Sequence, residues 1–162
     1  MDPKPQCAAE GIEALIRRHA DMVYRLAFSL VRSKSDADDI FQEVFLRLVR
    51  SRPAFESEAH QKAWLIRVTT NCAKKHWASP WMRRIQPLRE EIPFYLPEEQ
   101  DLSHALDGLS TNYRLVIHLF YFEEYSIEEI SKLLQRKPST VRAQLTRARA
   151  KLRHTLKEDF YV

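Results

Sequence analysis

Glycine is almost absent from this chain, which holds only Gly11 and Gly108 among its 162 residues. Tight turns between β-strands favour glycine, because several turn types need a positive φ angle that other residues rarely adopt. A sheet protein of this length would need more such turn residues than the chain contains. The scarcity therefore predicts helices joined by short connections, and with them an all-α fold.

Apolar residues in the N-terminal half recur every three or four positions, the spacing of one face of a helix. This spacing predicts helices over residues 10–32, 36–50 and about 61–77. Ser33 and Ser35 offer a stop for the first helix and an N-cap for the second. The polar residues 51–61 are expected to form a loop before the third helix.

The C-terminal half has the same spacing together with clear helix-start signals. A short helix is expected from about Leu102, and Ser110 is expected to cap a second one. Ser126 and Glu129 form a capping box, in which the two side chains satisfy free backbone amides at a helix start. A three-residue turn, Gln135–Lys137, then leads to a last helix that begins near residues 138–140.

The periodic pattern stops over residues 79–101. This segment holds four prolines, which prevent a continuous helix, and its second half is acidic. The sequence therefore predicts two small helical domains, residues 8–78 and 102–160, joined by a flexible linker.

Composition narrows the function classes. The net charge of +4 favours an anionic partner only modestly. Two cysteines fit neither a disulfide framework nor a paired metal site. The longest apolar run, residues 115–122, is far shorter than the ~20 residues of a membrane span. The first residues lack the apolar core of a secretory signal peptide. We expect a cytoplasmic protein without membrane insertion, metal or cofactor.

The last two predicted helices and their tight turn form a helix-turn-helix whose second helix is basic. Residues 130–157 hold nine bases and no acid. Bases along one element neutralise DNA phosphates, and Arg and Gln can read base edges in the major groove. The side chains expected to face away from the apolar positions are Arg142, Gln144, Thr146, Arg147 and Arg149. The pattern favours DNA binding over the alternative, a merely solvated basic helix.

The third predicted helix carries Arg67, Asn71, Lys74 and Lys75 on one face, and Trp64 precedes them. Bases beside aromatic rings suit unstacked single strands, because rings stack on bases while cations follow the backbone. The residues alone leave a second interpretation equally open, in which Trp64 belongs to the core and the bases are merely solvated.

The second predicted helix is acidic at its start and also carries aromatic residues. Its acids are Asp36, Asp38, Asp39 and Glu43, and its rings are Phe41 and Phe45. Acids at a helix N-terminus compensate the helix dipole, which accounts for Asp36. The remaining acids, with spare aromatics, could instead form a docking face for a basic protein.

Three stretches together resemble the extracytoplasmic-function sigma factors, small members of the bacterial sigma family. Residues 36–51, DADDIFQEVFLRLVRS, resemble the helix of sigma region two that grips the polymerase β′ clamp helices. Residues 62–77, KAWLIRVTTNCAKKHW, resemble the helix that reads and melts the minus-ten element. Residues 125–156, YSIEEISKLLQRKPSTVRAQLTRARAKLRHTL, resemble region four, which reads the minus-thirty-five element. Where the family usually carries glycine near the turn, this chain has Gln135 and Ser139.

The resemblance implies a role for individual residues. Polymerase binding is implied for Asp39, Gln42, Glu43 and Phe45. Minus-ten binding is implied for Phe55, Trp64, Arg67, Asn71, Lys74 and Lys75, with the loop 51–61 capturing a flipped-out base. Minus-thirty-five binding is implied for Lys137, Ser139, Thr140, Arg142, Gln144, Thr146, Arg147 and Arg149. The implied partners are core RNA polymerase, through its β′ clamp helices and β flap, promoter DNA and an anti-sigma factor.

Three alternatives stay open. A stand-alone helix-turn-helix regulator would bind specific duplex DNA without polymerase, and an interaction protein with a basic tail would bind without sequence preference. An enzyme is disfavoured, because the chain shows no nucleophile–base pair and no phosphate-binding loop. Cys72 and His76 lie one helical turn apart with His60 as a third candidate ligand, but a buried thiol beside a surface histidine is the simpler interpretation.

Overall fold

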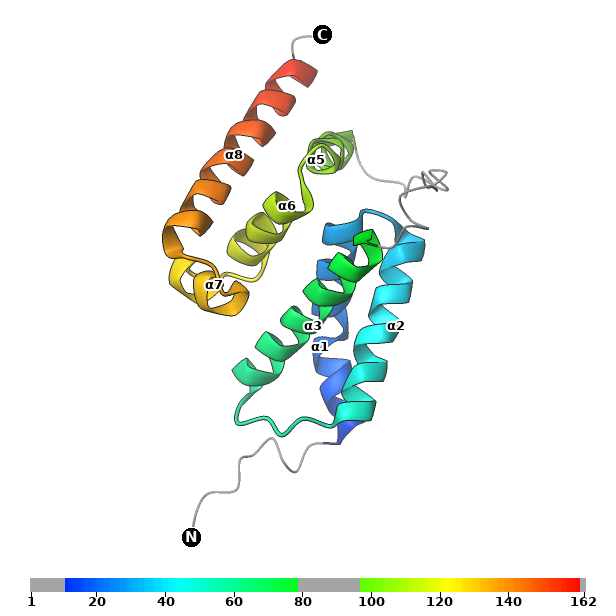
Figure 1. The fold of residues 1–162 in the computed structure, drawn as a ribbon. Helices are drawn as coiled ribbons and strands as arrows, with labels where there is room; N and C mark the ends of the chain where they lie inside the picture. Colours follow the sequence, from blue (N-terminus) through cyan, green and yellow to red (C-terminus); the bar gives the residue numbers. More distant parts are fainter. Residues whose placement is uncertain (1–10, 79–96, 161–162) are drawn as a thin grey trace. The chain divides into compact units, whose positions relative to one another are not determined.

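The computed structural model describes residues 11–78 and 97–160, and within these ranges it contains helices and no strand (Figure 1). The chain divides into two compact units after Gln86, which are described separately below. The predicted all-α fold is confirmed for the described residues. None of the helices in these ranges is long and apolar enough to cross a membrane.

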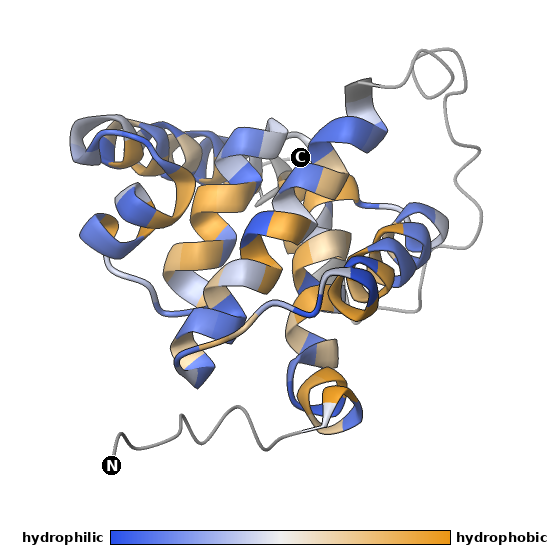
Figure 2. Ribbon diagram, turned by 60° about the horizontal axis from the view of Figure 1, so that its bottom comes forward, coloured by the Kyte–Doolittle hydropathy of each residue, from blue (hydrophilic) through white to orange (hydrophobic). Residues whose placement is uncertain are grey.

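The first unit is a bundle of three helices, α1 (Ile12–Val31), α2 (Lys34–Ser51) and α3 (Glu58–Ala78), each of which packs on the other two. The chain reverses direction between successive helices (Figure 1). Apolar and polar residues fall on different sides of the helices (Figure 2). The core is built from large aliphatic side chains with almost no exposure, among them Val23, Leu26, Leu30, Val44, Leu48, Leu65 and Ile66.

Hydroxyl groups cap the starts of α2 and α3. The Ser33 hydroxyl accepts a hydrogen bond from the Asp36 amide at 3.4 Å, so of the two candidate serines Ser33 is the N-cap of α2, and the helix begins two residues before the predicted start. The Ser57 hydroxyl accepts one from the His60 amide at 3.0 Å. Helix α3 consequently begins at Glu58, three residues before the predicted start. The predicted loop 51–61 is therefore shortened to residues 52–57.

The second unit contains α5 (Pro97–Asp107), α6 (Thr111–Ile117), a π-helical segment η2 (His118–Phe122), α7 (Ile127–Leu134) and α8 (Pro138–Phe160). Helix α8 packs against α5, α6 and α7. The buried aliphatic residues of this unit include Leu115, Val116, Leu119, Ile130, Val141 and Leu145. The predicted cap at Ser110 is confirmed, since its hydroxyl accepts from the Tyr113 amide at 3.3 Å.

The start of α5 differs from the prediction. The helix begins at Pro97, five residues before Leu102, where the linker was expected to continue. Proline suits the first helical position, because its fixed φ is helical and its missing N–H has no partner to lose there. Pro97, one of the four prolines expected to prevent a continuous helix, is therefore the first residue of α5.

Arg114 is a buried charge that the sequence analysis did not single out. Its side chain is 6% exposed and donates to the carbonyls of Leu106 and Leu109. These carbonyls lie at the end of α5 and just beyond it, where helical partners run out and a cation is favourable. Arg114 therefore joins the start of α6 to the end of α5.

Candidate docking and nucleic-acid interfaces

The outer face of α2 combines acidic, polar and apolar side chains. Asp39 and Gln42 are exposed, and half-buried Glu43 pairs with Arg47, with 3.0 Å between Glu43 Oε1 and Arg47 Nε. Leu46 and Val49 are 46% and 42% exposed. Asp39, Gln42, Leu46 and Val49 are spaced to lie along one side of the helix, and we call them the α2 stripe. Neighbouring exposed apolar side chains rimmed by polar groups can form a protein-docking surface.

Phe45 does not belong to this outer face. It is 8% exposed and packs edge-to-face on Phe41, with 4.8 Å between the ring centroids. Phe41 in turn lies edge-on to Tyr24 of α1 at 6.0 Å. The bundle therefore covers most of the Phe45 ring, and its contact with a partner stays a prediction. Leu46, the next residue along, provides the exposed apolar surface instead.

Helix α3 presents a basic outer face, as predicted. Arg67, Asn71, Lys74 and Lys75 are all exposed. On the buried side, Thr69 and Thr70 donate their hydroxyl hydrogens to the carbonyls of Leu65 and Ile66. Because these hydroxyls are satisfied within the helix, the polar threonines can face the core. The exposed face is left with donors and positive charge that can follow a phosphate backbone.

The loop before α3 is held by aromatic contacts. Phe55 is 9% exposed and lies edge-on to Trp64 at 5.8 Å and to His60 at 5.4 Å. Trp64 is half-buried, so part of its surface remains open beside the loop. Phe55 therefore packs under the loop and exposes little of its own surface, and its contact with a nucleic acid stays a prediction.

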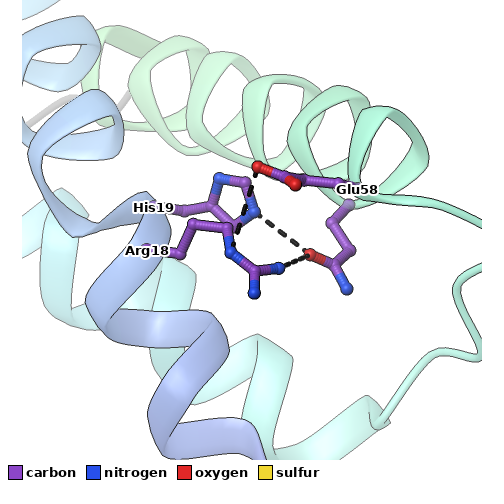
Figure 3. Close-up of polar contacts among 4 residues, drawn as sticks. Arg18, His19 and Glu58 are labelled. Atoms are coloured by element: carbon purple, nitrogen blue, oxygen red, sulfur yellow. Dashed lines mark hydrogen bonds and ion pairs between the residues drawn. The ribbon is translucent and has the colours of Figure 1, made fainter. Parts of the chain in front are cut away.

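A polar cluster that the sequence analysis missed ties the start of α3 to α1 (Figure 3). Gln61 is fully buried, and its Oε1 accepts from Arg18 at 3.3 Å and lies 3.1 Å from His19 Nε2. Arg18 also lies 3.9 Å from the carboxylate of Glu58. Burial lowers the pKa of His19, which is 4% exposed, and thus favours its neutral form. The cluster fixes the end of α3 that adjoins the loop.

The candidate metal ligands of the first unit do not gather into one site. Burial raises the pKa of the Cys72 thiol and keeps it protonated. His76 faces Asp36 of α2, with 3.1 Å between Nε2 and Oδ1, and His60 accepts a hydrogen bond from the Glu56 amide. Within residues 11–78 and 97–160, no three His, Cys, Asp or Glu side chains lie close enough together to hold a metal ion.

The helix-turn-helix is present in the second unit as α7, a short turn and α8. The predicted capping box is confirmed, because the Ser126 hydroxyl accepts from the Glu129 amide at 3.1 Å and the Glu129 carboxylate accepts from the Ser126 amide at 3.2 Å. The turn begins at Gln135, which adopts a left-handed conformation with φ of 54°. The Ser131 hydroxyl donates to the Arg136 carbonyl and closes the turn.

Helix α8 buries Val141, Leu145 and Ala148 and exposes most of its predicted contact residues. Gln144 and Arg149 are half-buried, while the exposed residues of the predicted set are Lys137, Ser139, Thr140, Arg142, Thr146 and Arg147. A shallow hollow of about 480 Å³ runs between α8 and the start of α6. Five α8 residues line it, namely Ser139, Thr140, Ala143, Gln144 and Arg147, facing Ser110, Asn112 and Tyr113.

The other flank of α8 faces η2. Arg149 donates to the Tyr121 hydroxyl at 2.5 Å, and its guanidinium lies 5.4 Å from the centroid of the Phe120 ring. Cation–π contacts of this kind hold an arginine in place. Arg142 and Thr146 lie seven and three residues before Arg149, so helical spacing puts them on the same flank. The predicted contact residues thus fall on two flanks, of which one lines the hollow.

Comparison with known proteins matches both units. The family models Sigma-70 region 2 and Sigma-70, region 4 match residues 15–83 and 99–152. The ECF RNA polymerase sigma factor SigE of Mycolicibacterium smegmatis is 34% identical over 164 residues, covering 93% of this chain and 63% of that protein. This chain therefore spans less than two thirds of the length of SigE. SigX of Bacillus subtilis, another ECF sigma factor, is 30% identical over 145 residues, covering 76% of this chain and 72% of that protein.

A solved structure has the same fold. The sigma factor RpoE of Bartonella quintana, in a complex with the anti-sigma factor NepR, matches with a TM-score of 0.71 and 21% identity, covering 90% of this chain and 96% of RpoE. The two regions occur in the same order along this chain as in the family, and relatives at 30% identity or more span most of it. The chain therefore belongs to the extracytoplasmic-function (ECF) subfamily of bacterial RNA polymerase sigma factors.

Proposed function

We propose that this chain binds core RNA polymerase and directs promoter-specific initiation by reading a minus-thirty-five and a minus-ten element. The observation that carries the proposal is the helix-turn-helix α7–α8, whose second helix buries one stripe and exposes a polar and basic face. Such a face can enter the major groove.

The α2 stripe is the proposed contact with the β′ clamp helices. Asp39 and Gln42 supply polar and acidic groups, Leu46 and Val49 add exposed apolar area, and half-buried Glu43 lies beside the stripe as a further proposed contact. Acids select a basic partner surface, and buried apolar area provides most of the affinity. The second unit is the proposed partner of the β flap.

The basic face of α3 is the proposed minus-ten surface. Arg67, Asn71, Lys74 and Lys75 can follow one strand. A base taken out of the stack loses a few kcal/mol of stacking, so a protein surface must replace that contact. The proposed surface for the unstacked base is the loop of residues 52–57 beside Trp64, where Phe55 packs against the Trp64 ring.

On α8, the two flanks divide the proposed minus-thirty-five contacts. Ser139, Thr140, Gln144 and Arg147, which line the hollow, are placed to meet base edges. Arg142 and Thr146 on the other flank, and Lys137 in the turn before α8, are exposed and placed to meet phosphates, which position the protein without reading sequence. Arg149, which donates to the Tyr121 hydroxyl, is proposed to meet a phosphate as well.

The proposed organisation is region two over residues 8–78, a linker over 79–101 and region four over 102–160, with the linker shortened at its end by the first residues of α5, which begins at Pro97. The chain is proposed to act by binding alone, in the bacterial cytoplasm with the polymerase, and to catalyse no reaction itself. An anti-sigma partner is part of the proposal. Its support is the likeness in fold to RpoE, which is bound to the anti-sigma factor NepR.

Run-off transcription tests the function. Purified bacterial core polymerase is supplied with a pool of promoter fragments, with and without this chain. Initiation at discrete sites only when the chain is present is the expected result. No added initiation, together with specific duplex binding by the chain alone, would favour a stand-alone regulator. Binding without sequence preference would favour an interaction protein.

A further inference from the structure

Arg136, the second residue of the turn, joins two helices through one guanidinium. Its Nη1 donates to Oε1 of Gln144 on α8 at 2.9 Å, and its Nη2 donates to Oδ1 of Asn112 at the start of α6, also at 2.9 Å. Arg136 and Gln144 are half-buried. Gln144 and Asn112 both line the hollow beside α8, so the contact lies directly at the proposed base-reading surface.

The chemistry of arginine determines how the Gln144 amide is turned. A guanidinium has donors and no acceptor, so only the amide oxygen of Gln144 can face it. The Nε2 group, with its two donor hydrogens, is then the part of the amide that remains available to a ligand. The other described residues provide no hydrogen-bond partner for that group.

A free glutamine can pair with adenine through both atoms, because its oxygen accepts from N6 while its nitrogen donates to N7. In this structure the oxygen is engaged by a cation 2.9 Å away. The positive charge disfavours the approach of an amino group and favours electronegative atoms. Guanine presents N7 and O6 in the major groove, and thymine presents O4.

We propose that Arg136, held by Asn112, fixes Gln144 as a hydrogen-bond donor that selects guanine or thymine at one position of the minus-thirty-five element. Arg136 is a positioning residue in this arrangement, and Gln144 touches the base. The inference rests on the proposed function and adds the chemical class of the base that this flank of α8 reads.

The test is transcription by the complete chain with core polymerase from templates whose minus-thirty-five element is randomised. The position that Gln144 reads is the one whose preference is lost in Gln144→Ala. At that position we expect the unaltered chain to favour guanine or thymine over cytosine about five- to tenfold, the effect of one good hydrogen bond. Gln144→Glu replaces the donor by a second acceptor, so its preference should change to cytosine, whose N4 donates.

Arg136→Met frees the amide, so adenine should become as good as guanine or thymine to within about twofold, while preferences at other positions stay unchanged. Arg17→Met is the matched control for the lost charge, because Arg17 lies on the exposed surface of α1, paired with Glu13. Thermal unfolding shows whether each variant is folded. If Arg136→Met is not folded, Asn112→Ala takes its place. It removes one of the two hydrogen bonds that hold the guanidinium, and it should partly weaken the base preference at the same position.

The outcomes separate the two proposals. No initiation from any template by the unaltered chain overturns the proposed function. Initiation with a preference for adenine or cytosine at the Gln144 position overturns the inference alone. The same holds if Gln144→Glu leaves the preferred base unchanged, or if folded Arg136→Met and Asn112→Ala lower activity equally on all templates.

Discussion

Gln135 carries a backbone conformation that glycine adopts more easily. Its φ of 54° lies in the left-handed region, where a side chain costs roughly 1–2 kcal/mol. Glycine avoids this strain but loses more freedom on folding, so we expect Gln135→Gly to stabilise the second unit by about 0.5–1 kcal/mol. Amide hydrogen exchange of α7 and α8 measures the change. Slower exchange in α7 and α8 with unaltered exchange in α1 is expected, and faster exchange would contradict the argument.

His19 makes the first unit sensitive to acid. Burial is the largest cause of its lowered pKa, Arg18 and Lys62 act in the same direction, and Gln61 and Glu58 oppose them. Below about pH 6.5, the ordinary value, the unfolded chain therefore binds the proton better than the folded chain. The free energy of unfolding should fall as pH decreases below that value and should be insensitive to this group above it.

Tryptophan fluorescence can follow this effect, because Trp64, Trp77 and Trp81 all precede Gln86, where the first unit ends. Between pH 7.5 and 5.5 the urea midpoint of the unaltered chain should decrease more than that of His19→Gln. The variant lacks the titrating ring but keeps a polar side chain. Equal slopes for both proteins would show that the proton uptake lies elsewhere.

The α2 stripe should contribute to polymerase affinity without contributing to the stability of the bundle. Leu46 is 46% exposed, so replacing it should leave the bundle intact. Covering its exposed part against a partner is worth roughly 1.5 kcal/mol, about tenfold in Kd. Leu46→Glu should therefore weaken binding to core polymerase about tenfold or more. Fluorescence anisotropy measures the affinity for core polymerase. Ala14→Glu is the control, because Ala14 is exposed on α1. Equal affinities of the two variants would rule out the stripe as the contact.

Helix positions were largely predictable, because the apolar spacing and the caps at Ser33, Ser110 and Ser126 are local signals. The exposed apolar residues of α2 were not. Leu46 and Val49 are exposed although they are apolar, so hydrophobicity alone could not assign them to the outer face. Of the candidate site, the exposed residues of α3 and α8 were predictable. The contact of Arg136 with Asn112 was not, since it joins residues 24 positions apart.

The charge of the whole molecule is unevenly distributed. Residues 130–157 hold nine of its 26 Lys and Arg and none of its 22 Asp and Glu, so this segment carries +9 while the rest of the chain carries −5. Attraction to DNA should consequently come mainly from α7, the turn and α8. Each base that neutralises a phosphate releases counterions, so it steepens the dependence of DNA affinity on salt concentration by about one unit of slope.

Arg142 separates this electrostatic contribution from base reading. It is exposed on the flank of α8 that does not line the hollow, so we expect it to meet a phosphate. Arg142→Gln should weaken promoter binding by the polymerase complex to a similar extent on every minus-thirty-five sequence, and should reduce the logarithmic salt slope by about one. Gln144→Ala should leave the slope unchanged, because it removes no charge. Binding titrations between 50 and 300 mM salt, a range of about 14 to 6 Å in screening length, measure both slopes. If Arg142→Gln changed the base preference at one position and left the salt slope unchanged, Arg142 would read a base. The assignment of its flank of α8 to phosphate contacts would then be wrong.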